Sequence, residues 1–182
     1  MLADSNLETL MAHYQRGDFD AAAALIDRVS PQLHRFFLAQ LAGRADADDL
    51  LQETWLRIHK VRHTYRPGEP VLPWFYAIAR RVRVDHYRKS IRTVVHQQAM
   101  EDMSRIAAPA SAESGHSDGL TALLAPLSEG EREVIEMLKV VGMSLEEVAR
   151  ATSCTVGSVK QKVHRAYKKL RETMSAAAFR KG

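Results

Sequence analysis

Apolar residues in the last third of the chain recur at the three- and four-residue spacing of an amphipathic helix. This spacing places five of them on one helix face: Val156, Val159, Val163, Ala166 and Leu170. Ser-x-x-Glu sequences, which are typical of capping boxes at helix starts, pair Ser128 with Glu131 and Ser144 with Glu147. The segment is therefore predicted to hold three helices, with a tight turn at 152–155 before the last one. Two helices joined in this way form a helix-turn-helix.

Helical periodicity also runs through the amino-terminal half, in segments separated by glycine and proline. We expect helices over about 7–14, 25–41, 46–61 and 74–91, with Pro31 kinking or splitting the second. Three prolines place a loop before the fourth helix: Pro67, Pro70 and Pro73. Because no segment shows sustained alternation of apolar and polar residues, the predicted fold class is all-α.

The helical pattern weakens between positions 96 and 119, where Ala, Ser, Gly and Pro are frequent. Such a composition is typical of a flexible linker. We therefore expect two small helical domains, residues 1–95 and residues 120–182, that reorient relative to each other. A chain of 182 residues with 46% hydrophobic content has room for two small cores.

Composition argues against several classes of site. Cys154 is the single cysteine, so an internal disulfide is excluded. This residue is either an ordinary turn residue or a redox switch. His59 and His63 lie four residues apart without a third ligand, so we expect no metal, no cofactor and no catalytic residue. No apolar run approaches the roughly 20 residues that span a bilayer, and the start does not resemble a signal peptide, so we expect a cytoplasmic protein.

The net charge of +4 is concentrated in two segments. Residues 74–92 carry six Lys or Arg against Asp85 alone, and residues 156–182 carry eight against one Glu. Two separate basic segments predict two contacts with nucleic acid.

The last predicted helix presents a basic, hydrogen-bonding face opposite its apolar face. Four residues form it: Gln161, His164, Arg165 and Lys168. Arg and Lys pair with guanine and phosphate, and Gln and His bond base edges, so this face suits the major groove of DNA. The alternative is a solvated charged helix, but the short helix and tight turn before it favour DNA binding.

The predicted helix at 46–61 has a mixed outer face. Its apolar stripe is formed by Leu51, Trp55, Ile58 and Val61, and its outer face by Asp49, Gln52, Glu53, Leu56 and Lys60. An exposed leucine ringed by polar side chains suits an anchor for a partner helix. Ordinary surface is the alternative, since single exposed leucines are common.

The predicted helix at 74–91 alternates aromatic and basic residues. Phe75, Ile78, Ala79 and Val82 are expected to point inward, and Tyr76, Arg80, Arg83 and Tyr87 outward. Unpaired bases stack on aromatic rings while guanidinium groups follow the backbone, so the outer face suits single-stranded DNA. The loop at 64–73 could close over an extruded base. A solvated basic helix with two amphipathic tyrosines is the alternative.

Three motifs in this order resemble the sigma-70 family of RNA polymerase sigma factors, in its short extracytoplasmic-function (ECF) type. The sequence DADDLLQETWL at 46–56 is similar to the family's region 2, and PWFYAIARR at 73–81 to the helix that follows. Residues 127–134, 144–149 and 157–160 resemble region 4. The resemblance covers nearly the whole chain.

This resemblance implies three sets of site residues. Those that dock on the clamp coiled coil of the largest polymerase subunit are Asp48, Asp49, Gln52, Glu53 and Leu56. Those that hold the minus-ten promoter element as a single strand are Tyr76, Arg80, Arg81, Arg83 and Tyr87. Those that meet the minus-thirty-five element as duplex are Lys160, Gln161, His164, Arg165 and Lys168. The second domain would also sit on the flap of the other large subunit.

The chain departs from the family pattern at positions that contact DNA. Arg81 stands where members often carry Asn, Gln161 and Lys162 where they carry Ser and Arg, and Tyr167 where they carry Arg. The promoter sequence therefore cannot be copied from a typical member.

The expected function is that of a transcription initiation factor without catalytic chemistry of its own. It would bind core RNA polymerase, select promoters and help to melt the minus-ten element. The resemblance also implies an anti-sigma factor, commonly a membrane protein with a cytosolic segment. A conventional helix-turn-helix regulator, dimeric on palindromic sites, is the alternative. A mimic that sequesters the inhibitor would resemble proteins with an added receiver domain, for which 182 residues leave no room.

Overall fold

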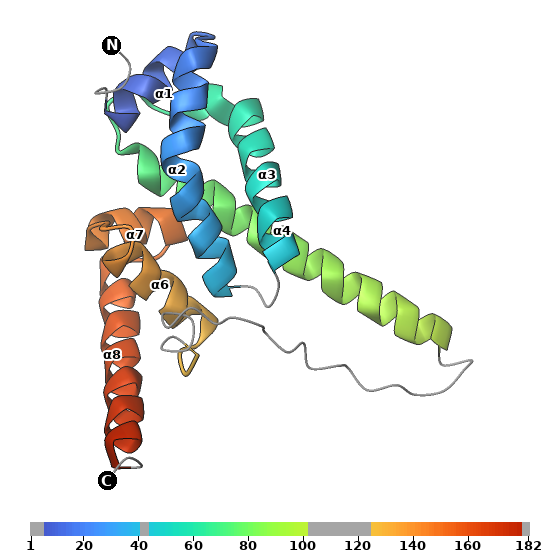
Figure 1. Cartoon of the computed structure of the whole chain (residues 1–182), viewed down its shortest axis with the longest axis vertical. Coiled ribbons are helices and arrows are strands. Elements are labelled where there is room, and N and C mark those ends of the chain that lie inside the picture. Colours follow the sequence, from blue (N-terminus) through green and yellow to red (C-terminus); the bar gives the residue numbers. More distant parts are fainter. Residues whose placement is uncertain (1–5, 41–43, 102–124, 180–182) are drawn as a thin grey trace.

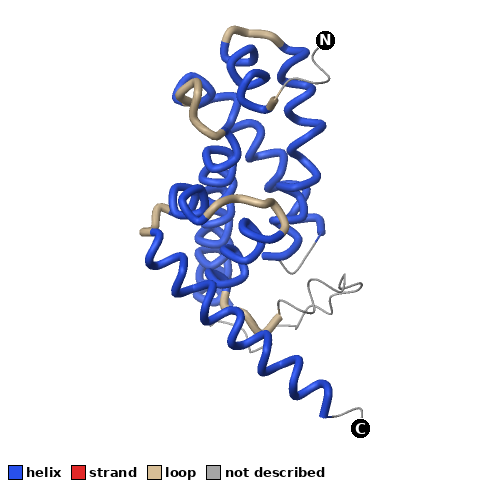
Figure 2. The backbone as a smooth tube through the Cα atoms, turned by 90° about the vertical axis from the view of Figure 1, so that its left-hand side faces the viewer, coloured by secondary structure: helices blue, strands red, loops and turns tan. Residues whose placement is uncertain are grey.

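The computed structural model describes residues 6–40, 44–101 and 125–179. Its elements are α1 (Leu7–Gln15), α2 (Phe19–Gln40), α3 (Arg44–Val61), a 3-10 helix η2 (Arg62–Thr64), α4 (Val71–Glu101), α6 (Glu129–Lys139), α7 (Leu145–Thr152) and α8 (Val156–Phe179). No strand occurs within these ranges, and the predicted all-α fold is confirmed (Figure 2).

Local hydrogen bonds fix the start of the chain's first two helices. Asn6 Oδ1 accepts a backbone N–H of the first turn of α1 at 2.8 Å, and Asp18 Oδ1 does the same for α2 at 3.0 Å. Gly17, between them, has a φ of 95°, which a residue without Cβ adopts at no steric cost. Of the two alternatives expected at Pro31, a kink or a split, the split does not occur: α2 continues through Pro31 to Gln40.

Helix α4 is longer than predicted at both ends. It begins at Val71, whose N–H donates to Glu8 Oε1 of α1 at 3.2 Å. Pro73 therefore lies in the first turn, where its missing N–H costs no intrahelical hydrogen bond. The helix runs to Glu101, so it includes the first six residues of the predicted linker, and 102–119 lie outside the described residues. The division into two domains stays a prediction.

Both predicted capping boxes are present. The Ser128 N–H donates to Glu131 Oε2 at 2.9 Å, and the Ser144 N–H donates to a carboxylate oxygen of its own box at 2.7 Å. The turn of the helix-turn-helix is confirmed as well. Ser153 ends α7 in the left-handed conformation with a φ of 53°, and α8 begins three residues later.

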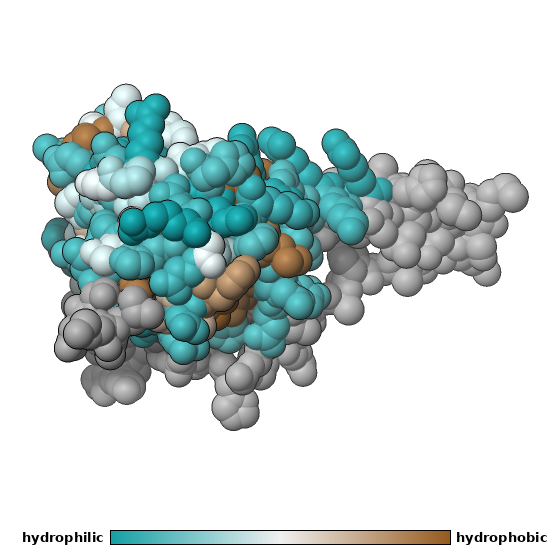
Figure 3. All heavy atoms as spheres, turned by 90° about the horizontal axis from the view of Figure 1, so that it is seen from above, coloured by the Kyte–Doolittle hydropathy of each residue, from teal (hydrophilic) through white to brown (hydrophobic). Residues whose placement is uncertain are grey.

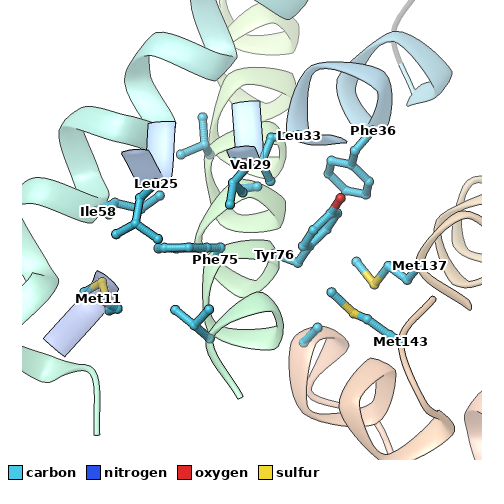
Figure 4. Close-up of a cluster of buried hydrophobic side chains, with 14 of the residues drawn as sticks. Met11, Leu25, Val29, Leu33, Phe36, Ile58, Phe75, Tyr76, Met137 and Met143 are labelled. Carbon is cyan, nitrogen blue, oxygen red and sulfur yellow. The ribbon is translucent and has the colours of Figure 1, made fainter. Parts of the chain in front are cut away.

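The helices of the two halves lie against each other. Figure 1 shows α6 and α7 beside α2 and α4, with the far end of α8 extending away from the rest. One buried cluster spans both halves: in Figure 4, Phe36 of α2 and Tyr76 of α4 lie close to Met137 of α6 and Met143 of the following loop. The view in Figure 3 is mostly hydrophilic, with small separate hydrophobic patches.

Candidate functional site

The outer face of α3 is accessible as predicted. Asp48, Asp49, Gln52 and Leu56 are exposed, and the Leu56 side chain is 53% exposed. His34 Nε2 of α2 lies 2.9 Å from Asp48 Oδ1, so the two side chains form an ion pair when the imidazole is protonated. Leu56 is thus an exposed apolar side chain that is surrounded by acidic and amide side chains on the outer face of α3.

Glu53, the fifth residue of this predicted set, is only half-exposed. It pairs with Arg57, whose Nε lies 2.9 Å from Glu53 Oε1 and whose Nη1 lies 2.6 Å from Asp85 Oδ2 of α4. These bonds to two carboxylates raise the pKa of Arg57. Glu53 therefore helps to tie α3 to α4 in addition to facing solvent.

The buried side of α3 is wider than the predicted stripe. Ile58 is buried as expected, but Leu50 and Thr54 are buried too, and Trp55 is half-buried with its Nε1–H donating to a serine of α2 at 2.9 Å. The reason is that α3 packs against α2 and α4 at once, and each partner covers a different part of its surface.

The basic face of α8 also forms as predicted. All five residues of the predicted duplex-binding set are exposed: Lys160, Gln161, His164, Arg165 and Lys168. Within the described part of the chain, none of them forms an ion pair. Val159 and Ala166, on the opposite side, are fully buried. The face is therefore free to meet a groove.

Cys154 is half-buried at the start of the turn. Its Sγ lies 3.6 Å from Lys162 Nζ, and its backbone N–H donates to Ala149 O at 3.0 Å. The residue thus has a structural place in the turn, and a redox role stays untested.

The predicted outer face of α4 requires a correction. Tyr76 and Arg83 were expected outside, but their residues are 0% and 6% exposed. The Tyr76 ring packs edge-on against Phe36 at 5.3 Å between centroids, and burial raises the pKa of its hydroxyl. Both lie under α6 and α7, because the second half of the chain covers the side of α4 that the first half leaves free.

The remaining residues of this set are more accessible. Arg81 and Tyr87 are exposed, whereas the Arg80 side chain is 35% exposed and lies against α6. Arg80 Nε lies 3.1 Å and 3.2 Å from the two carboxylate oxygens of Glu133. The five predicted residues therefore do not form one open surface in this arrangement.

A row of acids on α6 is the feature that the sequence analysis missed. Glu129, Glu133 and Glu136 recur at i, i+4 and i+7, and the last two are 2% and 1% exposed. Glu129 and Glu133 both pair with Arg83, the latter at 3.5 Å from Nη2. The spacing of these acids on one side of a predicted helix could have indicated an internal partner for the arginines of α4.

Glu136 lies deepest in this row. Burial raises the pKa of its carboxyl to about 8, against the opposing effects of a hydrogen bond with Gln40 and of the charges of Arg35 and Arg132. Burial also lowers the pKa of Arg83, although Glu133 opposes that shift. The contact of α6 with α2 and α4 therefore holds a carboxyl whose neutral form is favoured by burial, and a paired arginine.

The described residues contain no group of three or more His, Cys, Asp or Glu that could hold a metal ion. His59, one of the two histidines considered for metal, instead bonds the Tyr14 hydroxyl through Nδ1 at 2.7 Å. No helix in the described ranges is long and apolar enough to cross a membrane.

Comparison with known families assigns both halves of the chain. Residues 25–93 match Sigma-70 region 2, and residues 117–170 match Sigma-70 region 4. The first segment contains α3 and most of α4, and the second contains α6, α7 and the larger part of α8. The exposed face of α3 thus lies in the region 2 match, and the basic face of α8 lies in the region 4 match.

Curated relatives match over most of their length. The RNA polymerase sigma factor CarQ of Myxococcus xanthus is 32% identical over 169 residues, which are 90% of this chain and 95% of that protein. The ECF RNA polymerase sigma factor EcfG of Rhodopseudomonas palustris is 32% identical over 137 residues, which are 75% of this chain and 76% of that protein.

Solved structures share the fold. CnrH, in complex with the cytosolic domain of CnrY, superposes with a TM-score of 0.70 at 23% identity, over 93% of this chain and 97% of that one. The sigma factor RpoE of Bartonella quintana, in complex with the anti-sigma factor NepR, gives 0.63 at 25% identity, over 82% and 94%. With both regions matched in order, and with two relatives at 32% identity that are each matched over three quarters or more of their length, this chain belongs to the ECF group of the sigma-70 family of RNA polymerase sigma factors.

Proposed function

We propose that this sigma factor binds core RNA polymerase through α3 and promoter DNA through α4 and α8. The match of region 2 and region 4, in that order along one chain, carries the proposal. It acts as a transcription initiation factor with no catalytic residue and no cofactor of its own. Its place is the cytoplasm, where its polymerase and promoters are.

The polymerase contact is assigned to the exposed face of α3. Asp49, Gln52 and Leu56 stand out from a helix held on both sides by α2 and α4. A partly apolar patch with a polar rim fits a coiled coil such as the clamp of the largest subunit. We assign the flap of the other large subunit to the second half of the chain.

The minus-ten contact is assigned to α4 and the loop before it. Arg81 and Tyr87 are exposed for backbone pairing and base stacking, and Arg80 is partly so. Tyr76 is a buried core residue, and its direct contact with DNA would require α6 and α7 to leave. Binding only the separated strand would offset the few kcal/mol that each extruded base costs.

The minus-thirty-five contact is assigned to α8. Its five exposed residues present bidentate donors and cations to one side, as a recognition helix does in the major groove. The division into residues 1–95, a linker at 96–119 and residues 120–182 would let the two DNA contacts separate along the promoter. Because α4 ends at Glu101, the first six residues of the predicted linker belong to this helix.

An anti-sigma factor is proposed as the inhibitor. RpoE of Bartonella quintana, 25% identical to this chain, was solved with the anti-sigma factor NepR. This likeness supports a protein inhibitor that covers polymerase-binding faces such as that of α3, and a membrane-bound form with a cytosolic segment is one kind. Pull-downs from uninduced cells that recover polymerase subunits alone would count against it.

Run-off transcription tests the function. Purified core polymerase is combined with wild-type protein, with Asp49→Ala/Gln52→Ala, or with the matched surface control Asp20→Ala/Asp27→Ala, on fragmented host DNA. We expect discrete starts with wild type and control and none with the α3 variant. Binding of duplex DNA as a dimer, without any transcript, would instead support the conventional helix-turn-helix regulator.

A further inference from the structure

The loop between α3 and α4 is held at both ends by α1. At its start, Gln15 Nε2 donates to the carbonyl oxygens of Arg62 at 2.7 Å and of Tyr65 at 2.8 Å. At its end, Glu8 Oε1 accepts from the N–H of Val71 at 3.2 Å. Helix α1 accordingly lies beside η2 and α4 (Figure 1). Contacts that span 47 to 63 positions of the sequence therefore fix where this loop begins and ends.

The middle of the loop is fixed by its own tyrosine. Tyr65 is 3% exposed, its ring centroid lies 5.7 Å from that of Trp74, and its hydroxyl donates to Glu69 O. The Glu69 N–H donates to Arg66 O at 3.2 Å and closes a turn in which Gly68 has a φ of 91°. The loop is thus held in one conformation by contacts within the chain.

Between these anchors the loop presents two basic side chains to solvent. His63 and Arg66 are exposed, and neither forms an ion pair with any residue that the structure describes. An imidazole ring stacks on unpaired bases, and a guanidinium group pairs with phosphate or lies over a base. Because both residues stand on backbone that Gln15 and Tyr65 hold, their positions depend on these anchors.

Gln15 makes the most direct of these attachments. A glutamine amide nitrogen carries two N–H groups, and here the carbonyls of Arg62 and Tyr65 take one each, on either side of His63. The neighbouring Tyr14 strengthens the attachment, because the Arg62 guanidinium carbon lies 5.7 Å from the centroid of its ring. A side chain without donors at position 15 would leave both carbonyl groups without this partner.

Holding a binding group in place in advance improves selection, because ordering it at the moment of binding costs free energy. A misplacement of about 1 Å in a well-fitted site can cost about 100-fold. We propose that Gln15 is a positioning residue for base selection: by holding the Arg62 and Tyr65 carbonyls, it sets where residues 62–70 meet an unpaired base of the minus-ten element. Gln15 acts through the loop, since both of its amide donors are already used. This role rests on the proposed function, which assigns the minus-ten contact to α4 and the loop before it.

The test measures which bases the polymerase holoenzyme selects from single-stranded DNA. Core polymerase with the full chain is mixed with oligonucleotides of about 20 nucleotides, in which about eight central positions are randomised, and the bound strands are sequenced. Core polymerase alone gives the background. The variant His63→Ala/Arg66→Ala identifies the positions at which the loop selects a base.

Two substitutions of Gln15 separate its donors from its size. Gln15→Leu keeps a side chain of similar size without donors, and Gln15→Lys keeps donors. The control is Ile58→Val, at a fully buried site on α3, which perturbs the core but leaves the contacts of Gln15 intact. We expect Gln15→Leu to reduce base enrichment about fivefold, only at the positions that the loop variant identifies. Gln15→Lys should recover most of this enrichment, and Ile58→Val should match wild type.

Unchanged enrichment with Gln15→Leu would overturn the positioning role. An equal loss at every position would overturn it too, because that result indicates a purely structural residue. If Gln15→Leu is unfolded by circular dichroism, Gln15→Asn replaces it with the same expectation, since its shorter side chain cannot reach both carbonyls.

Two further outcomes concern the strand contact itself. If His63→Ala/Arg66→Ala alters no position, the loop selects no base and the positioning role is wrong, while the rest of the proposed function stands. If the wild-type holoenzyme enriches no base over core polymerase, the proposed minus-ten contact is wrong, and the role of Gln15 falls with it.

Discussion

Glu133 Oε1 of α6 lies 3.1 Å from Arg80 Nε of α4, in a contact that joins the two matched regions of the chain. The Glu133 side chain is 2% exposed, so its charge is almost completely removed from water. A charge buried in this way is stable only with its partner in place. The stability of region 4 in this arrangement therefore depends on region 2.

The pH dependence of stability is expected to follow Glu136. Its pKa is 4.5 ordinarily and about 8 in the folded protein, so the folded state keeps a proton that the unfolded state loses. The contribution of this residue to the free energy of unfolding is fully present below pH 4.5. It is lost progressively as the pH rises from there through about 8. Glu136→Gln should flatten this part of the profile and stabilise the protein at pH 9, as measured by urea denaturation. A variant whose profile parallels that of wild type would contradict the assignment.

The two tyrosines of α4 should behave differently. Tyr76→Ala removes a fully buried ring and should lower the free energy of unfolding by about 3–5 kcal/mol. Tyr87→Ala, at a side chain that is 65% exposed, should change it by less than about 0.5 kcal/mol. Tyr76→Phe should be nearly neutral, because the Tyr76 hydroxyl has no partner among the described residues. Equal losses for Tyr76→Ala and Tyr87→Ala in thermal denaturation would show that Tyr76 is not in the core.

Two positions on α3, Leu56 and Ile58, should separate binding from stability. Leu56→Ala should weaken core polymerase binding by about 1–2 kcal/mol without changing stability, because an exposed anchor acts only in the complex. Ile58→Val should do the reverse and lower stability by about 0.5–1.5 kcal/mol at a fully buried site. Polymerase titrations and denaturation curves on both variants check this. Normal polymerase affinity for Leu56→Ala would remove the α3 face from the docking surface.

Substitutions on α8 should distinguish base reading from phosphate contact. Gln161→Ala or Arg165→Ala should cost about 1–3 kcal/mol on the cognate minus-thirty-five duplex and relax sequence preference. Lys168→Ala should weaken all duplexes alike and reduce the salt slope by about 1. Lys139→Ala, exposed at the end of α6, serves as the control. The measurement is duplex binding at several salt concentrations, and uniform losses for all three α8 variants would argue against base reading.

Much of the fold followed from the sequence because it depends on neighbours along the chain. The capping boxes at Ser128 and Ser144 and the turn at Ser153 involve residues within a few positions of each other, so their chemistry is visible in the sequence. The exposed faces of α3 and α8 followed for the same reason: each helix buries its apolar side against close partners in its own half.

What the sequence could not decide was which side of α4 is covered. Seen alone, α4 shows an apolar side and a side with Tyr76 and Arg83, and the helical wheel assigns the second side to solvent. Only the tertiary structure brings Glu133 from 50 positions after Arg83 to pair with it and packs Met137 beside Tyr76. The sequence by itself determined the helices, their caps, the family motifs and the two free faces, since these follow from local spacing. The burial of Tyr76 and Arg83 depends on α6 and α7, whose position is set by long-range packing.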